Sequence, residues 1–283
     1  MRIAHLSDLH FAKLTYDPRQ FFSKRWVGNC NLLFNRSKVY CNERPFALIP
    51  FLKQLGIEMC LITGDLTTTG TRAEYRMAKA FTDELEKNGI RFFAIPGNHD
   101  CYTKKNAKQK TFYRYFPDRF DSSAYSLKSD RLTTTPLCQG WHMVALDTTI
   151  ATSLFSAEGL FPKTLEEILP EALEHIDSHV LMINHYPFTQ HEKNRRLLRR
   201  GPALQATLEK NQVDIYLHGH THRRCLADLR PSQLPIILDS GSAAHHALSS
   251  FNVLDLAPSS CKATVYQWDD VHWSPIQKEN FTW

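Results

Sequence analysis

Residues 2–10 read RIAHLSDLH, which predicts a short, largely apolar strand that stops at two polar residues, Asp8 and His10. The same pattern recurs along the chain. Apolar runs at 59–62, 92–95, 180–183 and 213–217 end shortly before Asp65, Asn98, His185 and His220. Strands buried on both faces read as continuous apolar runs, and ligands collect beyond the carboxyl ends of parallel strands. We therefore expect these polar residues to converge at one edge of a sheet.

Helix-like stretches lie between these runs, at residues 71–87, 164–175 and 195–210. Strands that alternate with helices predict an α/β fold in which helices cover both faces of a sheet. After Pro235, strand-like runs at 236–239, 251–256 and 262–268 follow without a long helix, and they suggest a second sheet closed largely by hairpins. No repeat or flexible linker interrupts the chain, so residues 1–283 are expected to form a single layered domain.

Composition places the chain among soluble globular proteins, because 42% of its 283 residues are hydrophobic and 22% are charged. The 34 Lys and Arg residues against 29 Asp and Glu give a net charge of +5, which suits an anionic substrate or surface. Seven scattered cysteines without a C-x-x-C pair indicate free thiols in a reducing compartment. The sequence shows neither a signal-peptide pattern nor an apolar stretch that could span a bilayer, so we expect a cytoplasmic protein.

Residues 18–42 do not fit the alternation of strand-like and helix-like stretches. They contain no acidic residue, and we interpret them as an inserted amphipathic element. Its basic residues are Arg19, Lys24, Arg25, Arg36 and Lys38. On a helix, one apolar stripe would contain Phe22, Trp26, Cys30 and Leu33. Such a segment can place its apolar residues in a membrane surface while its cations meet phosphates. The alternative is a helix that covers the sandwich.

The polar residues at the strand ends are of types that bind divalent cations. Asp8 and His10 are separated by one residue, so a turn can direct both side chains toward one cation. The carboxylate of Asp65 can bridge two cations with its two oxygens. His220 and His222, in the sequence Gly-His-Thr-His at 219–222, can address neighbouring cations.

Residues 97–100, Gly-Asn-His-Asp, add a ligand and catalytic groups. The amide oxygen of Asn98 is a suitable hard ligand, and His185 supplies a further imidazole. His99 can carry a proton, and Asp100 can orient it. Each feature alone is common in proteins. Five such strand ends without a thiolate favour a catalytic di-metal site over a structural zinc site.

Taken in order, D-x-H, G-D, G-N-H-D, a lone His and G-H-x-H resemble the signature of the calcineurin-like metallophosphoesterases, over residues 8–222. The resemblance implies a four-layer αββα sandwich of two mixed β-sheets flanked by helices. It also implies that one metal is held by Asp8, His10, Asp65 and His222. The other metal would be held by Asp65, Asn98, His185 and His220. Mn²⁺ is the expected metal, with Fe²⁺, Zn²⁺ and Mg²⁺ left open.

The resemblance implies a phosphoester hydrolase with two cations roughly 3.5 to 4 Å apart, which acidify a bridging water and bind the phosphoryl oxygens. His99, oriented by Asp100, would steady the developing charge or protonate the leaving oxygen. The Asp-Arg-Gly that protein phosphatases carry after this Gly-Asp is missing. The run G-D-L-T-x-x-G-T-x-x-E-Y at 64–75 instead resembles bacterial cyclic-nucleotide phosphodiesterases and a relative that cleaves UDP-2,3-diacylglucosamine in lipid A synthesis.

The insertion at 18–42 favours the lipid-linked substrate, whose hydrolysis releases UMP and 2,3-diacylglucosamine 1-phosphate. We expect it to bind an anionic surface, on the cytoplasmic face of the inner membrane. The basic run at 193–200 adds to that surface, or it is a solvated helix face. Cyclic-nucleotide cleavage is the alternative. A nuclease is less expected, because the cations are interleaved with large apolar residues, and a non-catalytic scaffold conflicts with the presence of His99.

Overall fold

The first sheet joins strands from the two ends of the chain. The computed structural model describes residues 1–13, 39–153, 156–189 and 196–283. In it β1 (Arg2–Leu6), β2 (Met59–Ile62) and β3 (Arg91–Ala94) run parallel. The sheet continues through antiparallel pairs from β1 to β12 (Ser250–Ala257), β13 (Ser260–Trp268) and β14 (Trp273–Thr282). Its order is β14-β13-β12-β1-β2-β3.

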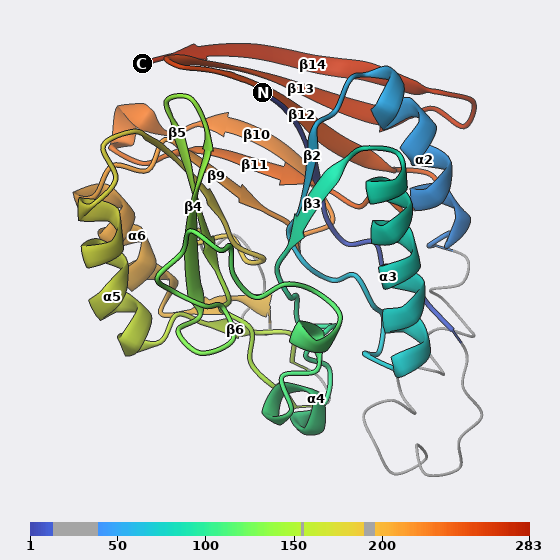
Figure 1. The fold of residues 1–283 in the computed structure, drawn as a ribbon, viewed down its shortest axis with the longest axis horizontal. Helices are drawn as coiled ribbons and strands as arrows, with labels where there is room; N and C mark the ends of the chain where they lie inside the picture. Colours follow the sequence, from blue (N-terminus) through green and yellow to red (C-terminus); the bar gives the residue numbers. More distant parts are fainter. Residues whose placement is uncertain (14–38, 154–155, 190–195) are drawn as a thin grey trace.

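The second sheet lies against the first and has the order β10-β11-β9-β7-β5-β4 (Figure 1). Its four central strands are parallel: β11 (Ile236–Ser240), β9 (Ile215–His218), β7 (His179–Ile183) and β5 (Trp141–Leu146). The antiparallel edge strands are β10 (Arg224–Asp228) and β4 (Leu132–Cys138). A small separate pair consists of β6 (Gly159–Leu160) and β8 (Leu198–Arg199).

The strands after Pro235 correct one expectation. They do not build a second sheet of their own, because β11 joins β9 while β12 to β14 extend the sheet that begins with β1. The hairpins therefore close the first sheet. The reason is register: β12 pairs with β1 from Arg2↔Asp255 to His5↔Asn252, so the end of the chain completes the sheet that its beginning starts.

Alternate residues of the strands face different layers, as expected for strands buried on both sides. In β2, Met59 and Leu61 belong to the apolar cluster between the two sheets, whereas Cys60 and Ile62 face the helices outside. In β9, Leu217 faces the other sheet and Tyr216 faces outward. This alternation produces three apolar layers between four layers of structure.

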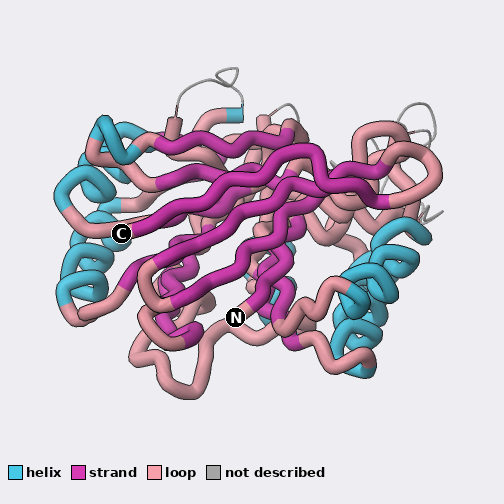
Figure 2. The backbone as a smooth tube through the Cα atoms, turned by 90° about the horizontal axis from the view of Figure 1, so that it is seen from above, coloured by secondary structure: helices cyan, strands magenta, loops and turns pink. Residues whose placement is uncertain are grey.

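Helices cover the outer face of each sheet, as Figure 2 shows from above. The first sheet is covered by α2 (Glu43–Gln54) and α3 (Arg72–Lys87), and the second by α5 (Lys163–Glu174) and α6 (Gly201–Lys210). The short α4 (Lys104–Lys108) and two 3₁₀ turns, Phe112–Arg114 and Arg230–Ser232, lie in connections. The four-layer αββα sandwich is thus confirmed.

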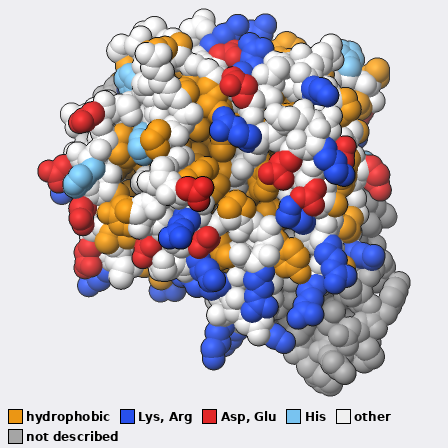
Figure 3. All heavy atoms as spheres, in the orientation of Figure 1, with side chains coloured by type: hydrophobic (Ala, Val, Ile, Leu, Met, Phe, Trp, Pro, Cys, Tyr) orange, Lys and Arg blue, Asp and Glu red, His pale blue; other side chains and the backbone are white. Residues whose placement is uncertain are grey.

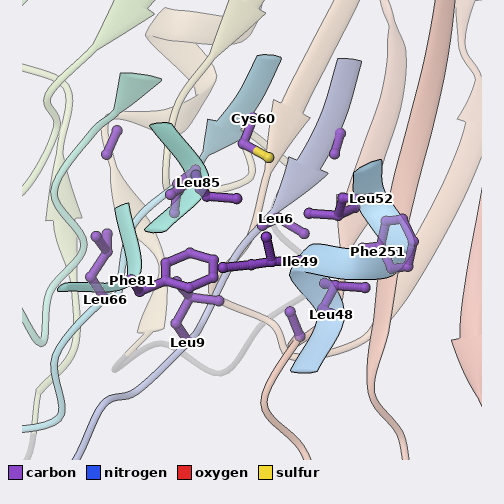
Figure 4. Packing of buried hydrophobic residues seen from close by; sticks show 14 of the residues in the cluster. Leu6, Leu9, Leu48, Ile49, Leu52, Cys60, Leu66, Phe81, Leu85 and Phe251 are labelled. Atoms are coloured by element: carbon purple, nitrogen blue, oxygen red, sulfur yellow. The ribbon is translucent and has the colours of Figure 1, made fainter. Parts of the chain in front are cut away.

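Packing fixes α2 and α3 on the first sheet. Leu48 and Leu52, one turn apart on α2, and Phe81 and Leu85 on α3 are fully buried, and Figure 4 shows them around Leu6 of β1. Each such side chain contributes roughly 1.5–3 kcal/mol by leaving water. A capping box at Thr71 and Glu74 starts α3 directly after the loop that carries Asp65.

The helix expected at 195–210 is shorter in the structure. It begins at Gly201, because Leu198–Arg199 forms β8 and Arg200 has a left-handed backbone with φ of 61°. Arg199 and Arg200 therefore lie outside the helix. The inserted segment falls mostly outside the described residues, of which only 39–42 belong to it.

The six described cysteines are free, in agreement with the sequence. Across the described ranges, no helix has the length and apolar character needed to cross a membrane.

Candidate metal centre

Residues from the strand ends meet between the two sheets, as the sequence predicts. Asp8, His10, Asp65 and His222 each place one ligand atom within 4.8 Å of the others. Nε2 of His222 lies 3.0 Å from Oδ1 of Asp8 and 3.2 Å from Nε2 of His10. The first three residues are buried, and the His222 side chain is 26% exposed. His222 is therefore the most exposed member of this group.

A second group lies on the other side of Asp65. Nε2 of His185 is 3.1 Å from Oδ1 of Asn98 and 3.6 Å from Oδ1 of Asp65. The rings of His185 and His220 are 5.1 Å apart. The other oxygen of Asp65, Oδ2, faces Nε2 of His10 at 3.8 Å. The two oxygens of Asp65 thus face two different sets of ligands, as a bridging carboxylate requires.

The backbone at several of these residues adopts an uncommon left-handed conformation. Non-glycine residues seldom adopt positive φ, because Cβ then meets the backbone, and such strain persists mainly at functional sites. Five expected ligands nevertheless have positive φ: Asp8 at 53°, His10 at 46°, Asp65 at 51°, His220 at 71° and His222 at 58°. These left-handed turns direct the side chains inward from the strand ends.

Two glycines let the loops approach each other. A Cβ at Gly97 would collide with the backbone and carboxylate of Asp65, and a Cβ at Gly219 would collide with Ser7. The absence of side chains at these positions lets the loops after β1, β2, β3 and β9 approach one another closely.

Hydrogen bonds to carbonyl groups fix which ring nitrogen of two histidines is available. Nδ1 of His185 donates to the carbonyl of Thr63 at 2.7 Å, and Nε2 of His220 donates to the carbonyl of Arg196 at 2.9 Å. Because a carbonyl only accepts, the lone pair lies on Nε2 of His185 and on Nδ1 of His220. Burial lowers the pKa of His185, and lowers that of His220 well below its usual range. Both rings are thus held neutral, the form that binds metals.

The carboxylate of Asp8 gives a direct test of whether a cation fits. Oδ2 accepts a hydrogen bond from the backbone N–H of His220 at 3.0 Å. Oδ1 is buried and accepts no hydrogen bond of suitable geometry from a described donor. Burial raises the pKa of this carboxyl, but the neighbouring His222 and His10 hold it well below its usual range. A buried anionic oxygen without a donor fits a cation bound between Asp8, His10 and His222.

His99 lies beside both groups without belonging to either. Its backbone N–H donates to Oδ1 of Asp65 at 2.7 Å, and its ring Nδ1 donates to the carbonyl of Thr68 at 2.6 Å. The ring meets that of His10 edge-on at 4.9 Å and stacks on Tyr102 at 5.5 Å. It lines a cavity of about 370 Å³. This placement suits a group that acts on a bound substrate.

The carboxylate of Asp100 accepts hydrogen bonds from two of the loops that carry expected ligands. Its carboxylate accepts hydrogen bonds from the backbone N–H groups of Leu66 (3.2 Å), Thr67 (2.9 Å) and Gly97 (2.9 Å), and from the Thr67 hydroxyl (2.8 Å). Burial raises its pKa to about 6, although these donors act in the opposite direction. Asp100 therefore joins the loops after β2 and β3. The His99 ring donates to the carbonyl of Thr68, the residue after Thr67, and the catalytic role of Asp100 stays a prediction.

Sequence reasoning missed Tyr40 and the cavity-facing role of Arg196. The cavity is lined by Val39, Tyr40, Asp65, Asn98, His99, Ala157, Arg196, His220, Thr221 and His222. Tyr40 lies near the end of the inserted segment, and Arg196 belongs to the basic run at 193–200. No motif marks either residue, because each reaches the site from a segment distant in sequence.

A four-layer sandwich whose strand ends gather Asp, His and Asn side chains defines a class, the metal-dependent phosphohydrolases. The chain belongs to the calcineurin-like phosphoesterases, because the model of that family matches residues 1–224. That range includes all seven expected ligands together with His99 and Asp100. The donor set fits two divalent metals, and the enzyme is a metal-dependent phosphohydrolase.

Solved structures share the fold at low sequence identity. A dimetal phosphatase from Danio rerio is 12% identical, with a TM-score of 0.65 over 99% of this chain and 98% of that one. The purple acid phosphatase PPD1 from yellow lupin is 12% identical, with a TM-score of 0.61 over 99% of this chain and 53% of that one. GAP50 of Plasmodium is 17% identical, with a TM-score of 0.59 over 100% and 88%. Among curated proteins, none matches the sequence.

Proposed function

We propose that this enzyme hydrolyses the pyrophosphate of UDP-2,3-diacylglucosamine, releasing UMP and 2,3-diacylglucosamine 1-phosphate at an anionic membrane surface. The hydrolytic part of the proposal is carried by one observation. Oδ1 and Oδ2 of Asp65 face separate ligand groups, at 3.6 Å from His185 and 3.8 Å from His10. This arrangement supports a two-cation centre.

Two bound cations would supply Lewis acidity toward the phosphoryl oxygens and an acidified water, and by resemblance we propose Mn²⁺. The protein's own groups would donate a proton and offset the charge of the phosphoryl group. With Nδ1 donating to Thr68, the neutral His99 ring has its lone pair on Nε2. When that nitrogen is protonated, it can donate to the leaving oxygen. Arg196, which lines the same cavity, has a guanidinium that can offset the charge of a phosphoryl group.

The ends of the inserted segment support its proposed place beside the metals. The chain before the segment and the last residue of the segment are joined directly. The backbone N–H and carbonyl of Ala12 are both hydrogen-bonded to the side chain of Asn42, at 2.9 Å each. Val39 and Tyr40, near the end of the segment, line the cavity. The segment thus leaves and re-enters the described fold next to the centre. We propose that it contacts the acyl chains and the head groups.

Described residues add a cationic rim to the same edge of the fold. The rim consists of Lys13, Arg72, Arg76, Lys104, Lys105 and Lys108, all exposed. In the part of the chain that the structure describes, none of them forms an ion pair with an acidic residue. Figure 3 shows Lys and Arg side chains gathered along the lower part of the face where Figure 1 places α4 and the start of α3.

A hydrogen bond connects the cationic rim to the loop that carries Asp65. Asn106 of α4 donates to the carbonyl of Gly70 at 2.7 Å, and Gly70 lies in the loop between Asp65 and α3. α4 itself follows the loop that carries Asn98. Cations at this edge favour an anionic surface or an anionic substrate. A cyclic nucleotide is small and needs no such surface, so it remains the second candidate.

The substrate assignment is tested by assaying purified, metal-loaded protein side by side on four compounds. These are UDP-2,3-diacylglucosamine, cyclic AMP, bis-p-nitrophenyl phosphate and single-stranded DNA. We expect the highest kcat/KM on the lipid-linked UDP. Preferential cleavage of cyclic AMP would replace the proposed substrate by the alternative, and preferential cleavage of DNA would establish a nuclease.

Replacing Phe22 and Trp26 together by Ser tests the apolar stripe of the inserted segment. We expect loss of liposome binding and of activity on the long-chain lipid substrate, because the stripe can no longer enter the bilayer. Hydrolysis of bis-p-nitrophenyl phosphate should stay nearly intact. Equal loss of both activities would identify the segment as a structural cover and favour the cyclic-nucleotide alternative. Unchanged lipid activity would also defeat the proposal.

Neutralising the rim tests its electrostatic part. The variant Lys104→Gln, Lys105→Gln, Lys108→Gln should bind vesicles with anionic lipid on the order of 10²-fold more weakly, because each cation contributes about 1 kcal/mol near such a surface. A matched variant carries the same charge change at Lys210, Lys262 and Lys278, on other exposed parts of the fold. Vesicle co-sedimentation compares the two. Equal losses in both would attribute the effect to net charge and contradict a local docking surface.

A further inference from the structure

Tyr40 contacts the first ligand group although it belongs to no motif. Its hydroxyl oxygen lies 2.5 Å from Nδ1 of His222. Its ring centroid is 4.7 Å from that of His10 and 5.8 Å from that of His222. The backbone of Tyr40 pairs with His245, so the residue is anchored to the loop after β11. Tyr40 therefore lies against two expected ligands of one cation.

The hydrogen bond to Tyr40 decides whether His222 can bind a metal. Nε2 of His222 faces Oδ1 of Asp8 at 3.0 Å and Nε2 of His10 at 3.2 Å, so it is the nitrogen directed at the centre. A neutral imidazole has one N–H and one lone pair. For Nε2 to offer its lone pair, Nδ1 must have the hydrogen and the Tyr40 oxygen must accept it.

Two other histidine ligands show how a hydrogen-bond partner fixes the tautomer. His185 and His220 each have one ring nitrogen hydrogen-bonded to a carbonyl, of Thr63 and Arg196, which fixes the tautomer unambiguously. For His222 the partner of Nδ1 is the Tyr40 hydroxyl, which can donate or accept. His222 is also the most exposed member of its group, with 26% of its side chain exposed.

We propose that Tyr40 is a positioning residue that holds His222 in the tautomer and orientation in which Nε2 binds the first cation. The proposal rests on the two-metal centre and not on the identity of the substrate. Outer partners of metal-binding histidines orient the ring and raise its basicity, and their loss typically weakens metal binding 10- to 100-fold. The phenylalanine variant keeps the ring contacts with His10 and removes only the hydroxyl.

The test titrates metal-free protein with Mn²⁺ by calorimetry. In Tyr40→Phe we expect one of the two sites to weaken about 10- to 100-fold, while the other keeps its affinity, and excess Mn²⁺ to restore kcat. Tyr186→Phe is the matched control. Its ring lies 4.6 Å from that of His220, but its hydroxyl donates to the carbonyl of Glu158 at 3.0 Å and contacts no ligand nitrogen.

A double-mutant cycle separates positioning from general loosening. In a His222→Ala background, Tyr40→Phe should change Mn²⁺ affinity no further, because the group it positions is gone. Unchanged affinity of both sites in Tyr40→Phe would overturn the proposal, and so would equal weakening of both. If wild-type protein bound two Mn²⁺ ions but hydrolysed none of the four assay compounds, the proposed function would fail while the role of Tyr40 stood.

Discussion

Replacing Asp65 by Ala is expected to disrupt both metal sites and reduce hydrolysis to the level of the metal-free protein. The two oxygens of Asp65 face two ligand groups, so one substitution removes a donor from each. Metal content per chain, measured on protein reconstituted with Mn²⁺ and then desalted, reports the effect directly. Asp65 also accepts the backbone N–H of His99 at 2.7 Å, so thermal unfolding of the metal-free forms must be compared as well.

The comparison variant for Asp65 is His10→Ala, which removes a donor from the first group only. It should weaken mainly one site and retain the other cation. If Asp65→Ala and His10→Ala lost metal to the same extent, Asp65 would be an ordinary ligand of one site and not a bridge. Retention of both cations by Asp65→Ala would exclude it from the centre.

Changing His99 to Ala or Asn should lower kcat on the order of 10²- to 10⁴-fold while both metals stay bound. Its side chain is held by the Thr68 carbonyl and lines the cavity, whereas its contact with Asp65 is made by the backbone N–H, which either substitution retains. Metal analysis and kinetics on the same sample separate binding from chemistry. Loss of metal in step with activity would show that His99 acts as a ligand.

The strand ends were predictable because two independent patterns coincide at them. The apolar runs alternate between layers, as Met59 and Cys60 do, and each stops at a residue that can bind a cation. The parallel order β1-β2-β3 then brings Asp8, Asp65 and Asn98 to the same edge. The position of each strand end and the type of residue that follows it can both be predicted from the local sequence.

Other features depend on partners that local sequence does not specify. The sequence of β12 to β14 indicates that these residues form strands, but it does not indicate which sheet they join. The pairing of β12 with β1 decides this. Helix α2 escaped prediction because Pro45 and Pro50 interrupt its pattern, although Pro50 is accommodated inside the helix. The hydrogen bonds of Asp100 to Leu66 and Gly97 likewise depend on how two loops meet.

The most direct test of the two-metal centre is anomalous diffraction from crystals of the metal-loaded protein, recorded on both sides of the absorption edge of the bound metal. We predict two anomalous peaks within about 4 Å of each other, with the carboxylate of Asp65 between them and His222 and His185 on opposite sides. A single four-coordinate peak with Asp65 unbound would contradict the account.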